Sequence, residues 1–171
     1  MALELNGTTG VSLVQDGVVT AADLASGAIT SAALPAGSVL QVVQDTYATE
    51  ISTSSTSFIS LGLSATINIS SSSNSVLAFV YHTTRKANNT TNTGYQSSLF
   101  RGATEVFSYI NFTYFLGSQL NGHQSYQFLD SPATTGNVTY SVQGKVHPNG
   151  GAFRVHDGNG ASTLILMEIA G

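Results

Sequence analysis

The chain has 171 residues, enough for one domain with a hydrophobic core. Only 8 % of its residues are Asp, Glu, Lys or Arg, against roughly 25 % in an average globular domain, so its surface must consist mainly of Ser, Thr, Asn, Gln and Gly. Five scattered cations cannot form the basic face of a nucleic-acid-binding protein, and the absence of cysteine excludes disulfides and thiol chemistry.

Residues 11–39 contain a short repeat with a period of ten residues. Four positions recur in the second copy: Gly17, Thr20, Ala22 and Leu24 return as Gly27, Thr30, Ala32 and Leu34. One copy cannot bury its few apolar side chains, so such units need neighbours. We therefore predict that residues 1–37 form an extended N-terminal arm, which contacts a neighbouring chain or another protein through Val19, Leu24, Ile29 and Leu34. The alternative is a flexible leader whose internal similarity is accidental.

Residues 38–171 consist of short apolar segments separated by Gly-, Asn- and Ser-rich turns about every ten residues. This spacing predicts nine or ten antiparallel strands and no helix. Val76–His82 is a continuous apolar run, which predicts a strand buried on both faces. It is far shorter than the roughly 20 residues that span a bilayer, and Met1–Gly10 lacks a signal-peptide pattern, so we expect no membrane insertion. The fold class predicted is all-β, an antiparallel, jelly-roll-like β-sandwich behind an extended arm.

The stretch 137–171 has the clearest pattern in the chain. Val138, Tyr140, Val142, Gly144 and Val146 alternate with polar residues, which predicts a half-buried strand. Gly-rich turns on both sides of residues 153–156 predict that three strands form an antiparallel meander. The last of these, 162–170, is apolar on both faces. One face fits the sandwich core, so the other requires a second layer or a second subunit.

Three further stretches carry a resemblance: residues 35–43, residues 128–143 and residues 162–171. Together with the ten-residue repeat, they resemble structural proteins of tailed bacteriophages, in particular cyanophage-like virion proteins. In that group a compact β-sandwich forms a capsid cement (decoration) protein or the tip of a tail fibre or tailspike. The resemblance implies a virion location and a homotrimer with the C-terminal strand near its axis. It implies no catalytic residue.

Candidate sites for chemistry are weak in this sequence. The acidic residues after position 50 are not paired as a glycosidase requires, and no Gly-x-Ser-x-Gly elbow or P-loop occurs. We expect no enzyme, no cofactor and no metal. His147 and His156 flank the predicted hairpin near Asp157, but two outward-facing polar residues explain them better than a metal site does.

Two further features bear on assembly. Glu168 lies among apolar residues on the last strand; either it has a cationic partner, Arg101, Lys145 or Arg154, or it reaches water at the strand end, which we favour. The aromatic residues of 107–115 indicate core or subunit interface more than sugar binding. We place the trimer interface at Leu164, Leu166 and Glu168.

The function expected from this reading is a non-enzymatic virion protein. It is a trimeric cement on the outer capsid, whose partners are its own copies and the major capsid protein. The alternative is a receptor-binding tip of a tail fibre or tailspike, with the loops 83–94 and 117–124 binding host glycans. A free, monomeric carbohydrate-binding module is a third option.

Overall fold

The computed structural model describes residues 33–86, 92–114, 120–147, 151–156 and 160–171. The chain divides into two units, Met1–Pro35 and Ala36–Gly171, and the second contains all ten strands. These strands are β1 (Val39–Tyr47), β2 (Ile51–Thr53), β3 (Ile59–Ile69), β4 (Ser75–Lys86), β5 (Asn92–Arg101), β6 (Thr104–Tyr114), β7 (Leu120–Asp130), β8 (Gly136–Val146), β9 (Phe153–Val155) and β10 (Ser162–Ile169).

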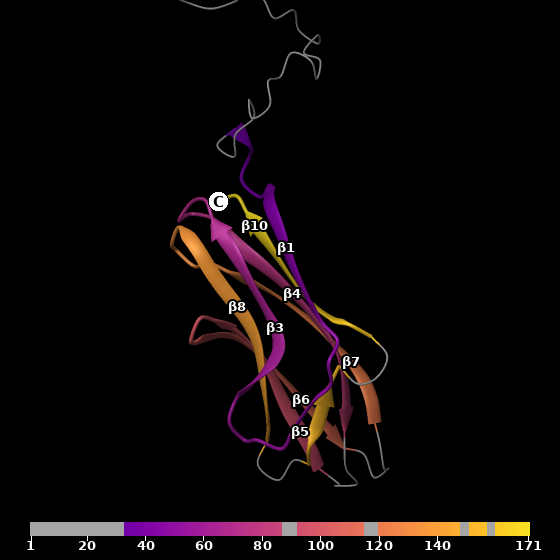
Figure 1. Ribbon diagram of the computed structural model, residues 1–171. Helices are drawn as coiled ribbons and strands as arrows, with labels where there is room; N and C mark the ends of the chain where they lie inside the picture. Colours follow the sequence, from indigo (N-terminus) through magenta and orange to yellow (C-terminus); the bar gives the residue numbers. More distant parts are fainter. Residues whose placement is uncertain (1–32, 87–91, 115–119, 148–150, 157–159) are drawn as a thin grey trace, which may run out of the picture. The chain divides into compact units, whose positions relative to one another are not determined.

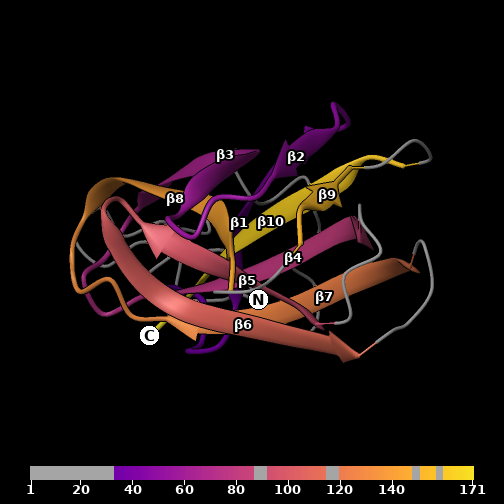
Figure 2. The ribbon, with the colours of Figure 1, turned by 90° about the horizontal axis from the view of Figure 1, so that it is seen from below.

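The strands form two antiparallel sheets that lie face to face as a sandwich (Figures 1 and 2). The first sheet contains β1, β10, β4, β9, β2 and β7, and the second has the order β3-β8-β5-β6. The prediction of an antiparallel β-sandwich is therefore confirmed. Alternation of apolar and polar residues explains it, because each sheet buries one face and leaves the other to solvent.

In the first sheet, two positions are each filled by two consecutive strands, which together form one line of the sheet: β1 with β2, and β10 with β9. β7 pairs along one edge of β4, whereas β10 and β9 pair in succession along its other edge. β1 and β2 then pair with β10 and β9. Counted as lines, the chain pairs its first strand with its last, its second with its seventh, its third with its sixth and its fourth with its fifth. This nested pairing is that of a jelly roll.

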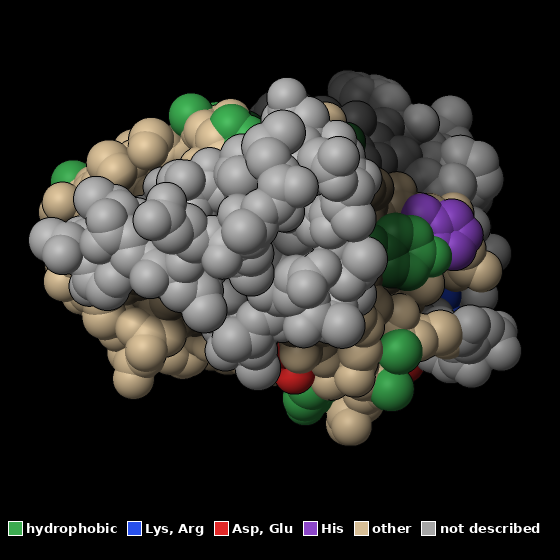
Figure 3. Space-filling model, turned by 90° about the horizontal axis from the view of Figure 1, so that it is seen from above, with side chains coloured by type: hydrophobic (Ala, Val, Ile, Leu, Met, Phe, Trp, Pro, Cys, Tyr) green, Lys and Arg blue, Asp and Glu red, His purple; other side chains and the backbone are tan. Residues whose placement is uncertain are grey.

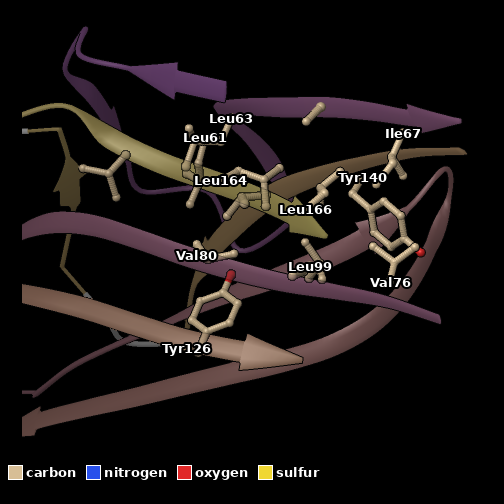
Figure 4. Packing of buried hydrophobic residues seen from close by; sticks show 14 of the residues in the cluster. Leu61, Leu63, Ile67, Val76, Val80, Leu99, Tyr126, Tyr140, Leu164 and Leu166 are labelled. Carbon is tan, nitrogen blue, oxygen red and sulfur yellow. The ribbon is translucent and has the colours of Figure 1, made fainter. Parts of the chain in front are cut away.

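The core lies between the two sheets and is formed by one contiguous cluster of apolar side chains. Figure 4 shows Leu164 and Leu166 of β10 among residues of β3 and β4. β3 and β8 contribute every second residue to this cluster, as the alternation in the sequence predicts. The inward face predicted for β8 is confirmed, since Val138, Tyr140, Val142, Gly144 and Val146 are all buried.

Gly62 shows how one residue shapes an edge strand. It lies within β3, where the pairing with β8 shifts register. Its φ is +84°, and a Cβ there would lie 2.6 Å from the Tyr47 ring. Only glycine combines this backbone conformation with such a close aromatic contact.

Two predictions about strands are wrong. The last three strands do not form a meander: β8 lies in the second sheet, and β9 and β10 follow each other along the same edge of β4. Both strands are antiparallel to β4, so the chain runs in the same direction in β9 and in β10. The strand Val76–His82 is also buried on one face only, because Leu77, Phe79 and Tyr81 point away from the second sheet.

Candidate functional site

The outer face of the first sheet carries apolar side chains in register across all four lines. Strand pairing places Val42, Met167, Leu77 and Leu129 in one row. The next row contains Ile165 and Phe79, flanked by two glutamines. We call the six residues Val42, Leu77, Phe79, Leu129, Ile165 and Met167 the apolar face.

These side chains are incompletely covered by their own chain. Val42, Leu129 and Phe79 are 56 %, 55 % and 37 % exposed, and the other three are half-buried. With strands about 4.8 Å apart and alternate residues about 6.7 Å apart, these six residues cover on the order of 200 Å². Together with the two glutamines and the uncharged Thr46–Ser125 row beside them, they form three rows of on the order of 400 Å², of which about half is apolar.

The apolar face is also free of charge. None of the residues in these three rows is Asp, Glu, Lys or Arg. The opposite surface, formed by the outer side of β3 and β8, is instead a polar array in which Thr66 and Thr139 join their hydroxyls at 2.7 Å. The two outer faces of the sandwich therefore differ in what they can bind.

The residues that the sequence placed at the trimer interface lie on the inner side of β10. Leu164 and Leu166 are fully buried in the core of the single chain, and Glu168 is 1 % exposed. The second sheet already covers these side chains, so they are not a free surface. The prediction assigned the two faces of β10 the wrong way round, because Ile165 and Met167 are the residues that point outward.

Predictions for the arm fall mostly on residues outside the described part of the chain. This holds for Val19, Leu24 and Ile29. Leu34 is described, and its side chain is exposed.

Glu168 is neither paired with a cation nor open to water, which corrects both readings of it. Its Oε1 accepts hydrogen bonds from the Ser70 backbone N–H at 2.7 Å, the Ser70 hydroxyl at 2.8 Å and the Asn74 amide at 2.7 Å. Its Oε2 accepts one from the Gln41 amide at 2.5 Å. Burial by itself would raise the pKa of Glu168, but these donors outweigh it and hold the pKa at about 2. The carboxylate thereby joins β10, β1 and the β3–β4 turn.

We expect Glu168→Gln to destabilise the fold by about 3 kcal/mol at pH 7, since the pKa falls from 4.5 to about 2 on folding. A depressed carboxyl pKa stabilises the fold above pH 4.5, and this contribution is lost as the pH falls towards 2. Urea unfolding at several pH values measures it. Glu50→Gln, which breaks only the exposed ion pair with Arg154, is the control and should change stability little.

A second group of polar side chains crosses the interior of the sandwich. We call His82, Ser97, Gln124, Tyr126, His156 and Ser162 the polar layer; all six are buried. The Ser97 hydroxyl lies 3.0 Å from His82 Nε2 and 3.1 Å from the Tyr126 hydroxyl. Burial, and then the nearby His156, lower the pKa of His82 to about 3, against an opposing interaction with the Thr83 backbone. Burial also raises the pKa of Tyr126, so both groups are neutral.

His156 does not face outward as the sequence suggested. It is 1 % exposed, with a φ of 59°, and its Nε2 lies 2.6 Å from the Leu61 carbonyl oxygen. Its Nδ1 is hydrogen-bonded to the Ser162 hydroxyl. His147 lies at the end of β8, where its backbone N–H donates to the Gly94 carbonyl, and Asp157 lies outside the described residues. Among the described residues, no three His, Asp or Glu side chains are grouped as metal ligands.

The aromatic residues of β6 that the structure describes, Phe107 and Tyr109, are partly buried and pack against the core, which is one of the two positions predicted for them. Phe107 packs against Tyr126 and Phe128, and Tyr109 stacks on Tyr126 with ring centroids 5.6 Å apart. The side chains of residues 111–115 lie outside the described part.

No protein-family model and no curated protein matches the chain. Among solved structures, the chain is similar to a chain of the structure of infectious bursal disease virus strain Gx, with 13 % sequence identity and a TM-score of 0.44. The match covers 78 % of this chain and 41 % of that one, so this chain spans less than half the length of the viral chain. A likeness at this level carries no argument about function.

The remaining described surface offers little charge. Figure 3 shows one end of the molecule, where hydrophobic and charged side chains form small separate patches among uncharged polar atoms. No helix in the described part of the chain is long and apolar enough to cross a bilayer. The apolar face is therefore the candidate functional site.

Proposed function

We propose that the chain is a non-enzymatic structural protein of a virion, which assembles with copies of itself through the apolar face. The observation that carries this proposal is the row of Val42, Met167, Leu77 and Leu129, which leaves one side of the sandwich apolar and uncovered. Covering such a face removes apolar surface from water, which is the main driving force of association.

A second copy of the chain is the occupant that fits this face best. Because the three rows hold no charged residue, the faces of three copies can meet around a three-fold axis without like-charge repulsion. The three charge-free rows cover on the order of 400 Å² of the outer face. The full outer face, about 40 Å by 19 Å, covers roughly 750 Å² but includes the paired Arg85 and Arg154 at one end. The charge-free part is therefore about half of the ~800 Å² per partner of a stable interface.

We propose a trimer that cements the outer capsid, with the major capsid protein as the second partner. The sequence resemblance to phage virion proteins supports the trimer and the location. A surface of Ser, Thr, Asn and Gln supports a passive structural role, because only 8 % of the chain is charged. For the arm and its contacts, the proposal rests on the ten-residue repeat alone.

The double variant Val42→Lys, Leu129→Lys tests self-association. Both side chains are more than half exposed in the single chain, so lysine is tolerated there, whereas an interface would bury two unpaired charges. We expect the wild type to have three times the chain mass of 17.7 kDa, about 53 kDa, and the variant to dissociate with at least a 100-fold weaker assembly constant. Light scattering during size-exclusion chromatography over a range of concentrations measures both.

The double variant Ser64→Lys, Asn137→Lys is the matched control, because it adds the same two charges to the exposed outer side of the second sheet. Its mass should equal that of the wild type. A wild type of 17.7 kDa at all concentrations would rule out self-association and favour a free carbohydrate-binding module.

The location on the virion is tested by copy number. Gel densitometry of purified particles should give hundreds of copies for a capsid cement and a few tens at most for a tail-fibre tip. The tip alternative relies on loops that lie partly outside the described residues. A location restricted to the tail would replace the cement proposal with it.

A further inference from the structure

The polar layer contains three side-chain atoms that are buried without a hydrogen-bond partner: His82 Nδ1, Gln124 Nε2 and Gln124 Oε1. His82 is 1 % exposed and Gln124 is 2 % exposed, so bulk water does not reach them. An unpaired buried polar group destabilises the fold, and fewer than one in ten is left unpaired in native proteins.

The two residues that hold these atoms are neighbours across two paired strands. His82 and Gln124 are paired across β4 and β7, and both side chains point between the sheets. Directly paired residues have Cβ atoms about 5 Å apart. In the second sheet, two small residues, Ser97 and Gly144, are paired. Ser97 reaches His82 with its hydroxyl at 3.0 Å, which places this part of β5 over the His82–Gln124 pair.

We propose that His82 and Gln124 bind an internal water molecule, or a pair of them, between the sheets. The inference concerns the interior of the single chain and does not depend on the proposed assembly. A buried water typically makes about three hydrogen bonds to otherwise unpaired groups, and the three atoms supply that number.

The chemistry of the two side chains selects water over a guest that only donates or only accepts. The Gln124 amide requires an acceptor at Nε2 and a donor at Oε1. His82 Nδ1 is a donor or an acceptor depending on whether Nε2 accepts from Ser97 or donates to it. Water donates twice and accepts twice, so it satisfies the amide with either imidazole tautomer.

A high-resolution crystal structure of the full chain tests the proposal directly. We expect density for water within hydrogen-bond distance of both Gln124 and His82 Nδ1. In solution, rotating-frame NMR spectra should show cross-peaks from water to the Gln124 side-chain amide with the sign of bound water, which is opposite to that of direct exchange. Gln124→Met should remove these signals and the density, and Gln127→Met, on the exposed side of the same strand, should leave them unchanged.

The wild-type measurements decide the question even if Gln124→Met does not fold. Density that shows no water, with Gln124 bonded to protein groups instead, would overturn the proposal. So would water density beside His82 Nδ1 that persists unchanged in a folded Gln124→Met protein. Neither result affects the mass of the assembly, so this inference and the proposed function fail separately.

Discussion

We expect Leu166→Asp to abolish folding of the single chain. Leu166 is fully buried in the core on the inner side of β10, where it packs with Leu164 between the sheets (Figure 4). Removing a buried leucine costs about 2–5 kcal/mol, and placing an unpaired carboxylate in the same site adds several more. The sum is more than about 5 kcal/mol, which matches or exceeds the stability of many domains. Far-UV circular dichroism and soluble yield measure the loss.

Met167→Asp is the matched variant, because it places the same charge one residue further along, on the outer face. We expect this variant to remain folded and to lose self-association. The pair of variants therefore distinguishes the two faces of β10. A folded Leu166→Asp chain beside an unfolded Met167→Asp chain would show that the inner and outer faces are assigned in reverse.

Acid should destabilise the fold well above the pH at which carboxylates titrate. The pKa of His82 falls from 6.5 to about 3 on folding, because the buried ring disfavours the charged form. Between pH 6.5 and pH 3, His82 is protonated in the unfolded chain but not in the folded chain. The free energy of unfolding therefore falls as the pH drops from 6.5 towards 3. The full difference amounts to roughly 4–5 kcal/mol. Urea unfolding measured between pH 7 and pH 4.5 should reveal more than half of it, before Glu168 begins to contribute.

His82→Gln isolates this effect, since glutamine is able to hydrogen-bond Ser97 but does not titrate. We expect it to flatten the dependence of stability on pH between 6.5 and 4.5. Part of the slope should remain, because burial also lowers the pKa of His156. An unchanged slope in His82→Gln would mean that the ring is accessible to protons in the folded state. His123→Gln, on the exposed side of β7, is the control.

The sequence predicted the alternation of apolar and polar residues within single strands, and it predicted the fold class. Val138 to Val146 point inward at every second residue, as predicted, because side chains of a strand alternate by geometry alone. The same rule identified β10 as apolar on both sides. It could not predict which side of β10 packs against the second sheet, because Leu164 and Leu166 are no more apolar than Ile165 and Met167.

The register between paired strands could not be predicted from the sequence for a different reason. The apolar face exists because Val42, Leu77, Leu129 and Met167, which are far apart in the chain, are paired in one row. Each of them taken alone is an ordinary strand residue. The polar layer was missed in the same way, since a lone His82 and a lone Gln124 carry no signal until strand pairing places them side by side inside the sandwich.

The sequence by itself determined that this protein is an antiparallel β-sandwich with a nearly uncharged polar surface, because alternation and composition are local properties of the chain. The tertiary structure alone decided which strands pair with which, that Glu168 is held by neutral donors, and that the uncovered apolar side is the outer face of β1, β10, β4 and β7. These features depend on contacts between distant segments, and a one-residue change of strand register would exchange the faces without altering any local pattern.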